Sequence, residues 1–228
     1  MSRIILIYGQ SGAGKSYSLK TLDPNKTFVV DADKKSFLPF EGSRQKYDKE
    51  KGNFFSTNSL DSIQKSIERI GTEEKFKHVD YLVIDGISKA LTVFEATYNK
   101  RNNPKNNFEA YKMLKEKTVD LFDFAKSQRD DLNIIFIGNV QLADPYQANS
   151  VDKLKVPGIF LKDYEVESDF NYVFYAKIIE NEHVFETYPN RSTAKTPEGS
   201  FPPTIANDMF YLVNQIDNYE NGVVAEES

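Results

Sequence analysis

Hydrophobic residues in this chain gather in short unbroken runs, each followed by polar residues. Four such runs, rich in β-branched side chains, lie at residues 4–8, 27–30, 81–84 and 134–138. Runs of this length and composition are typical of strands buried on both faces of a sheet. Segments with helical spacing separate them, at about residues 15–22, 59–70, 88–98 and 108–127. Strands that alternate with helices predict a three-layer α/β fold with a mainly parallel sheet.

The pattern changes after the fourth run. Residues 141–168 are polar and irregular, which predicts a long mobile loop. Beyond it, residues 172–179 and 183–188 predict an antiparallel hairpin, and a last helix is expected from about Ile205 to Tyr219. The C-terminal part of the predicted fold is therefore a hairpin followed by one helix.

Two further segments, residues 34–56 and 99–107, have no regular hydrophobic pattern and are expected to form loops. The chain contains no internal repeat. We therefore expect a single domain over residues 1–219 and a disordered tail over residues 220–228.

A complete phosphate-binding loop joins the first hydrophobic run to the first helix. It matches the pattern G-x-x-x-x-G-K-[ST] over residues 9–16. The glycines let backbone N–H groups surround a phosphate, Lys15 reaches the β- and γ-phosphates, and the Ser16 hydroxyl ligates Mg²⁺. The sequence thus predicts that ATP and Mg²⁺ are bound by nine residues: Gly9, Gln10, Ser11, Gly12, Ala13, Gly14, Lys15, Ser16 and Tyr17.

Polar side chains follow three of the predicted strands. Asp85 is placed to hold Mg²⁺, although an aspartate at this position can also cap the next helix. Asp33 is placed to activate the attacking water, and a simple turn aspartate is nearly as good an interpretation. Asn139 is placed to sense the γ-phosphate, with Gln141 as a competitor for that role.

Two segments are candidates for contact with nucleic acid. Lys100, Arg101 and Lys105 lie among asparagines, and cations of this kind bind phosphates. Rings that can stack on bases alternate with lysines in the segment 141–168, at Tyr146, Lys153, Lys155, Phe160 and Lys162. An exposed loop of mixed charge explains the second group equally well, because three aspartates are interspersed there.

Arg191 and Lys195 follow the predicted hairpin. A cation on a protruding element can reach the triphosphate of a neighbouring subunit, whereas most such residues are solvated surface charges. The two histidines, His78 and His183, receive no catalytic role.

Composition excludes several other classes of function. The chain of 228 residues has no cysteine, which excludes disulfides, thiolate metal sites and cysteine nucleophiles. A net charge of -5 argues against a uniformly basic nucleic-acid binder but leaves a local basic patch open. No hydrophobic run approaches the roughly 20 residues of a membrane span, and no signal-peptide cleavage site follows the first run. A cytoplasmic protein is therefore expected.

Taken together, these motifs resemble the RecA-like phage nucleotide-binding proteins of the P-loop NTPase superfamily, the Sak-type core-only recombinases or single-strand annealing ATPases. Val29–Asp33 resembles the strand that ends in their catalytic carboxylate, and Leu82–Ser88 resembles their metal-binding strand. Ile135–Asn139 resembles the strand whose last residue couples ATP to the DNA-binding loop. The family usually has Glu at the position of Asp33 and Gln at the position of Asn139.

The resemblance implies a RecA-like core and a DNA-stimulated ATPase that anneals or exchanges DNA strands. Its catalytic residues would be Lys15, Asp33, Asn139, Arg191 and Lys195, the last two acting on the next subunit. The implied partners are single-stranded DNA, further copies of the chain and a single-strand-binding protein, in the cytoplasm of a bacterial host. The loop 141–168 would be the DNA-binding loop.

Two alternatives stay open. A small-molecule or nucleotide kinase also uses a phosphate-binding loop, but its arginine-rich lid has no counterpart among the scattered arginines of this chain. A nucleotide-gated adaptor that hydrolyses ATP hardly at all is compatible with the departures at Asp33 and Asn139.

Overall fold

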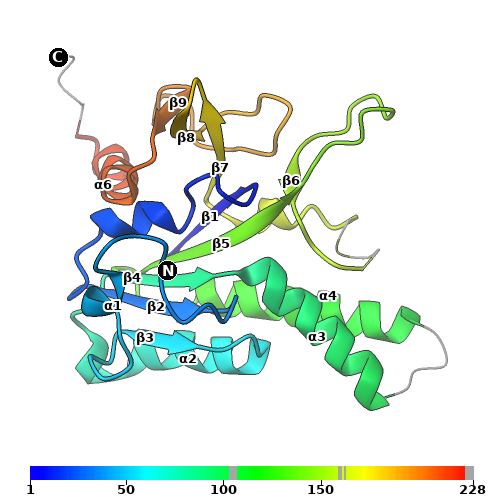
Figure 1. The fold of residues 1–228 in the computed structure, drawn as a ribbon, viewed down its shortest axis with the longest axis horizontal. Coiled ribbons are helices and arrows are strands. Elements are labelled where there is room, and N and C mark those ends of the chain that lie inside the picture. The colour runs from blue at the N-terminus through cyan, green and yellow to red at the C-terminus, as the bar shows by residue number, and fades with distance from the viewer. Residues whose placement is uncertain (103–106, 159–160, 162, 224–228) are drawn as a thin grey trace.

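The computed structural model of the chain describes residues 1–102, 107–158, 161 and 163–223. One sheet runs through it in the order β3-β2-β4-β5-β1-β7-β8-β9, with β6 paired to β5. Helices lie on both sides of this sheet (Figure 1). The strands are β1 (Arg3–Gly9), β2 (Thr27–Asp31), β3 (Phe54–Ser56), β4 (Tyr81–Asp85), β5 (Asn133–Gln141), β6 (Lys153–Leu154), β7 (Tyr172–Ile179), β8 (Glu182–Glu186) and β9 (Thr204–Ala206).

The α-helices are α1 (Ser43–Lys46), α2 (Leu60–Thr72), α3 (Ile87–Asn102), α4 (Asn107–Lys126) and α6 (Met209–Glu220). The described residues also form the 3-10 helices η1 (Tyr17–Thr21), η2 (Glu74–Phe76) and η3 (Val166–Asp169).

Two hydrophobic cores confirm the expected three layers. The first joins alternate residues of β1, β4 and β5 to the inner faces of α2, α3 and α4, with Phe122 and Phe136 in edge-to-face contact. The second joins the opposite face of the same strands to η1 and α6, through residues such as Leu19, Leu212 and Ile216. Because β1, β4 and β5 are covered on both faces, their sequences are hydrophobic throughout.

Strands β1, β2, β3, β4, β5 and β7 pair in parallel, and β7 pairs with β8 in antiparallel orientation. The expected hairpin is thus confirmed. The predicted start of the last helix is wrong, because Ile205 pairs with Phe185 as part of β9. The helix begins only at Met209, where the Asp208 side chain accepts a hydrogen bond of 2.9 Å from the Tyr211 backbone N–H.

The structure corrects three predictions for segments that lie earlier in the chain. The helix expected at residues 15–22 is only the short 3-10 helix η1, because Asp23-Pro24 follows closely and Leu22 is already extended. The expected loop 34–56 contains α1 and the edge strand β3. Part of the expected loop 99–107 is helical, since α3 continues to Asn102, and Lys105 lies outside the described residues.

The segment 141–168 is more ordered than the predicted mobile loop. Its two-residue strand β6 pairs with the end of β5, and Leu154 and Val166 are buried in the first core. The Glu167 carboxylate accepts a hydrogen bond of 2.6 Å from the Leu154 backbone N–H, which ties β6 to η3 within the same segment. The part between β5 and β6 projects from the body (Figure 1), whereas Phe160 and Lys162 lie outside the described residues.

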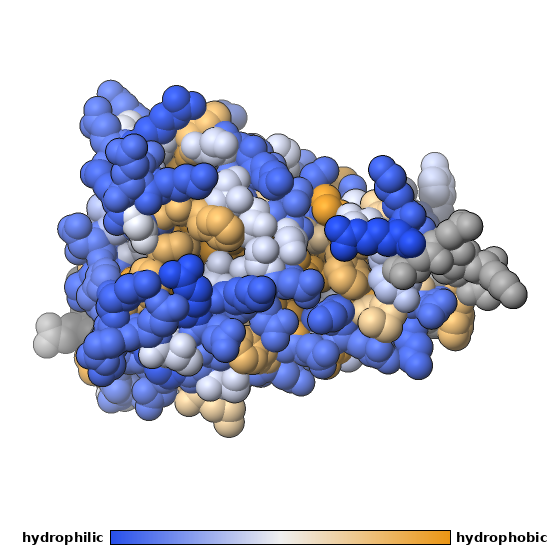
Figure 2. Space-filling view, turned by 90° about the horizontal axis from the view of Figure 1, so that it is seen from below, coloured by the Kyte–Doolittle hydropathy of each residue, from blue (hydrophilic) through white to orange (hydrophobic). Residues whose placement is uncertain are grey.

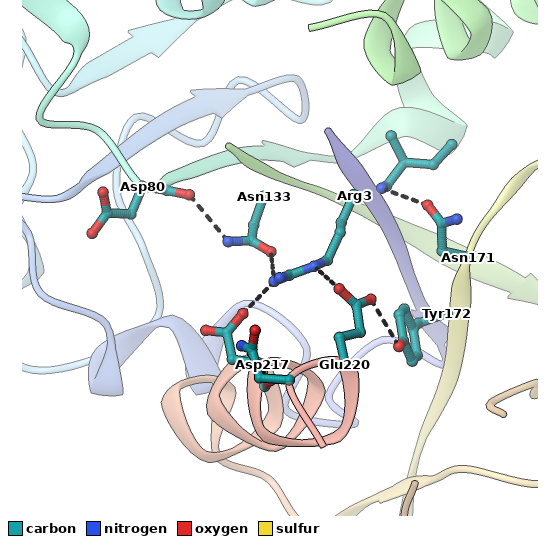
Figure 3. Close-up of polar contacts among 9 residues, drawn as sticks. Arg3, Asp80, Asn133, Asn171, Tyr172, Asp217 and Glu220 are labelled. Atoms are coloured by element: carbon teal, nitrogen blue, oxygen red, sulfur yellow. Dashed lines mark hydrogen bonds and ion pairs between the residues drawn. The ribbon is translucent and has the colours of Figure 1, made fainter. Parts of the chain in front are cut away.

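A polar network fastens α6 to the edge of the sheet at which the parallel strands begin (Figure 3). The Arg3 guanidinium donates to the Glu220 carboxylate at 2.7 Å, to the Asn133 amide oxygen at 3.0 Å, and also to Asp217. The Tyr172 hydroxyl donates to Glu220 at 3.0 Å. One arginine thus links β1, β5 and the last helix.

Arg3→Ala is expected to lower the free energy of unfolding by about 1–2 kcal/mol, because several charge-assisted hydrogen bonds are lost at a partly exposed site. Urea denaturation measures this change. Arg44→Ala, which removes an exposed arginine without an ion pair among the described residues, is the control. Equal stability of the two variants would contradict the structural role of Arg3.

Candidate nucleotide-binding site

The carboxyl ends of the parallel strands bring the phosphate loop and the strand-end polar residues to one edge of the sheet. Gly9 at the end of β1 is in register with Asn139 of β5, and Asp85 of β4 is in register with Asp31 and Ile137. A cavity of about 360 Å³ lies there. Its lining includes Ser11, Gly12, Gly14, Lys15, Ser16, Tyr17, Asp33, Asp85 and Asn139.

Gly9 allows the phosphate loop to leave the sheet between β1 and β7. A Cβ atom at this position would lie 2.2 Å from the carbonyl oxygen of Ala176 in β7, which no side chain tolerates. The first glycine of the motif is therefore needed for strand pairing, and the loop begins where that pairing ends.

Lys15 is the buried cation of the site. Its ammonium group donates to the backbone carbonyls of Gly9 at 2.8 Å and Gln10 at 2.7 Å. Burial lowers the pKa of Lys15 to about 8, although the Asp85 carboxylate opposes this shift. A triphosphate would supply the negative charge that the two carbonyls replace only in part.

Asp85 is the buried carboxylate of the site. Burial raises its pKa to about 6, while a hydrogen bond from the Ser16 side chain lowers it and the nearby Asp33 raises it. A buried carboxylate beside a hydroxyl suits a divalent cation, which takes oxygen ligands from protein, phosphates and water. Ser16 and Asp85 would therefore hold Mg²⁺, and the ion would stabilise the charged form of Asp85.

The described residues contain no group of three or more carboxylates and histidines that alone would bind a metal.

Asp33 lies in the same cavity, next to Gly86. Gly86 has φ of +105°, and a Cβ atom there would lie 2.7 Å from the Asp33 carboxylate, so glycine makes room for that side chain. The carboxylate forms an ion pair of 2.7 Å with Lys35. Its predicted role in activating water therefore requires that Lys35 release it or share it.

The two candidates for the γ-phosphate sensor line different cavities. Asn139 lines the nucleotide cavity, and its backbone N–H donates to the Ser88 hydroxyl at 3.0 Å. Gln141 instead pairs with Lys153 of β6 and lines a different cavity, formed with the segment 141–168. Position favours Asn139.

Arg191 and Lys195 do not line the nucleotide cavity within the described part of the chain. The Arg191 carbonyl accepts a hydrogen bond of 2.8 Å from the Asp152 N–H, and its side chain is exposed. Lys195 lies beside η3, where burial lowers its pKa. Action on a neighbouring subunit stays a prediction for both residues.

A tyrosine at the end of β1 connects the phosphate loop to two distant segments. The Tyr8 hydroxyl donates to the Asp152 carbonyl at 3.1 Å and accepts from the Thr193 N–H at 2.8 Å. The residue next to Gly9 is thus bound both to the segment 141–168 and to the segment that carries Arg191 and Lys195.

The sequence did not indicate three residues near the site. Lys35 and His183 line the nucleotide cavity, the latter from β8. The Asn207 amide lies beside Gly14, 3.0 Å from where a Cβ atom would stand, and its buried polar atoms have no partner among the described residues. The sequence could have indicated Lys35, because this residue lies two positions after the candidate Asp33. His183 and Asn207 reach the site only through the fold.

Comparison with known proteins agrees with this geometry. A family model described as an AAA domain matches residues 1–200 of the chain. The chain belongs to this AAA-domain family. Its AAA domain is of the P-loop nucleotide-binding type, and the cavity beside Lys15 and Asp85 is the place where the domain would take its nucleotide.

No curated protein matches the AAA domain described here. Among solved structures, the flagellar accessory protein FlaH from Methanocaldococcus jannaschii is similar, with 13% sequence identity and a TM-score of 0.45. The similarity covers 89% of this chain and 83% of that chain, and at this level it carries no functional inference. No helix in the described ranges has both the length and the apolar character of a membrane span.

Proposed function

We propose that this AAA domain is an ATPase that binds single-stranded DNA as an oligomer and promotes annealing or strand exchange. The nucleotide cavity would control the affinity for DNA, and DNA would in turn stimulate hydrolysis. The sequence resemblance to Sak-type phage recombination proteins names this activity, and one feature of the fold supports it.

That feature is the continuation of β5 beyond the nucleotide cavity. Asn139 lies in the nucleotide cavity, and two residues later Gln141 is already paired with Lys153 at the base of the projecting segment. One strand therefore leads from the predicted γ-phosphate sensor to an exposed segment, on which Tyr146 is 97% exposed. Exposed rings on such a segment suit stacking with unpaired bases.

Cations at the end of α3 and after β8 fit the same proposal. Lys100 and Arg101 are exposed in the last turn of α3, where they would contact the DNA backbone. Arg191 and Lys195 lie outside the nucleotide cavity of their own chain, as expected if they act on the triphosphate of the next subunit.

The ATPase rate with and without single-stranded DNA tests this proposal. We expect a severalfold increase with single-stranded DNA, a smaller one with duplex DNA, and a larger sedimentation coefficient when ATP is present. Unchanged turnover and sedimentation would contradict the proposal. Phosphate transfer to a nucleoside monophosphate in the absence of DNA would identify a kinase instead.

A further inference from the structure

A cavity of about 1040 Å³ lies far from the nucleotide, at the amino-terminal ends of β2 and β3. Its walls include Thr27 and Phe28, which open β2, whereas Asp31 at the other end of β2 pairs with Asp85 of the nucleotide site. A strand of this length spans roughly 16 Å at 3.3 Å per residue. The cavity is therefore separate from the nucleotide site, and we call it the basic groove.

The charges that line the basic groove are all positive. No aspartate or glutamate lies among its lining residues, although the chain as a whole carries a net charge of -5. Its cationic side chains are Lys46, Lys49, Lys51, Arg69 and Lys75. Such a concentration of one sign attracts a polyanion.

Little of this charge is neutralised by the protein itself. One carboxylate, that of Glu73, serves both Arg69 at 2.9 Å and Lys75 at 2.8 Å. In the described ranges no carboxylate forms an ion pair with Lys46, Lys49 or Lys51, all of which are exposed. Lys51 donates to the Gln45 backbone carbonyl, and each of the three ammonium groups keeps N–H donors for a ligand.

Aromatic rings line the groove between the cations. Phe28 and Phe76 are half-buried and contact each other edge to face, with ring centroids 5.9 Å apart. The Lys75 ammonium lies 5.0 Å from the centroid of the Phe76 ring. Seen from the side on which β3 and α2 lie, the surface has apolar side chains in a hollow that hydrophilic ones border (Figure 2).

We propose that the basic groove binds single-stranded DNA, with phosphates on the lysines and bases against the phenylalanine rings. Cations with interleaved rings are the combination that binds unpaired strands without base sequence preference. The inference rests on the proposed function for the identity of the polymer. It adds a binding surface that is independent of the segment 141–168 and of the nucleotide.

The test compares two double variants that remove the same charge. Lys49→Gln/Lys51→Gln alters the groove, and Lys65→Gln/Lys112→Gln alters exposed lysines of α2 and α4 that do not line it. Binding of fluorescent oligo-dT by the nucleotide-free chain is measured by anisotropy over a range of salt concentrations. All four side chains are exposed, so both variants are expected to keep the wild-type melting temperature.

The groove variant is expected to bind on the order of tenfold more weakly at low salt. Its slope of log affinity against log salt should fall by about 1.4, since each phosphate contact on a single strand contributes roughly 0.7. The control variant should match the wild type. Weaker binding of a polyglutamate peptide than of oligo-dT would support the role of the rings.

Equal affinities of the two double variants, or no binding of oligo-dT to the wild type, would overturn the proposal that the basic groove binds single-stranded DNA. If the wild-type ATPase is nevertheless stimulated by single-stranded DNA, only the groove fails and the proposed function stands. Loss of oligo-dT binding in the groove variant without any DNA effect on wild-type turnover would support the groove and contradict the proposed function.

Discussion

Lys15→Ala is expected to weaken ATP binding by roughly 100- to 1,000-fold, because truncating one member of a buried charge pair costs about 3–4 kcal/mol. Lys15 is 8% exposed and provides the buried ammonium of the nucleotide cavity. The γ- and β-phosphates would lose their closest cation, while the loop glycines would still supply N–H donors. Residual binding should therefore be weak rather than absent.

Isothermal titration with ATP and Mg²⁺ measures the loss, and Lys65→Ala is the control for removing a lysine without touching the site. The Lys15 variant is expected to fold, because the ammonium group that it lacks forms hydrogen bonds only with backbone carbonyls of the loop among the described residues. An affinity within threefold of the wild type would show that the nucleotide binds elsewhere.

Asp85→Asn is expected to have opposite effects on activity and on stability. If Asp85 holds Mg²⁺ as proposed, loss of the carboxylate removes one protein ligand of the ion, and hydrolysis should fall roughly 100-fold, equivalent to about 2.7 kcal/mol. The same change should stabilise the nucleotide-free chain at pH 7.5, because a buried charge disappears. A substitution that improves the fold while it damages turnover is characteristic of a functional site.

The stabilisation follows from the pKa of Asp85, which burial raises from 3.8 to about 6 in the folded chain. Between these two values the folded state binds more protons than the unfolded state, so the wild type loses stability as pH rises. The variant should therefore exceed the wild type by about 3 kcal/mol at pH 7.5, or about 6–12 °C in melting temperature.

At pH 4 this difference should disappear, because Asp85 is then protonated in the folded wild type. Thermal melting at both pH values measures it, with Asp130→Asn, at an exposed aspartate without an ion pair among the described residues, as the control. A variant that melts below the wild type at pH 7.5 would show that the Ser16 contact outweighs the cost of burying the charge.

The central strands could be predicted because each is covered on both faces. Residues such as Ile4–Ile7 and Leu82–Ile84 have no exposed side, so their hydrophobic character is visible without knowledge of the neighbours. The phosphate loop is equally visible, because its function fixes the residue type at four of its eight positions. The placement of Asp85 and Asn139 at one edge of the sheet follows from the parallel arrangement of their strands.

Other features depend on contacts between distant segments. β3 has only three residues and owes its conformation to pairing with β2, through Val29 and Phe54. Asn207 and Gly14 are brought together by the packing of α6 on η1, where the Thr21 hydroxyl accepts from the Met209 N–H at 3.1 Å. No local pattern in the sequence encodes such a contact.

The Tyr8 hydroxyl forms three hydrogen bonds, one with Asp152 and two with Thr193, and they bear on the order in which distant segments move. Because Tyr8 is fully buried, parting from either Asp152 or Thr193 would leave a polar group without a partner, at a cost of about 1–3 kcal/mol. The phosphate loop, the projecting segment and the segment that carries Arg191 are thereby joined at one atom. A displacement that starts at the nucleotide would reach the segment between β5 and β6 and the segment that carries Arg191 simultaneously rather than in succession.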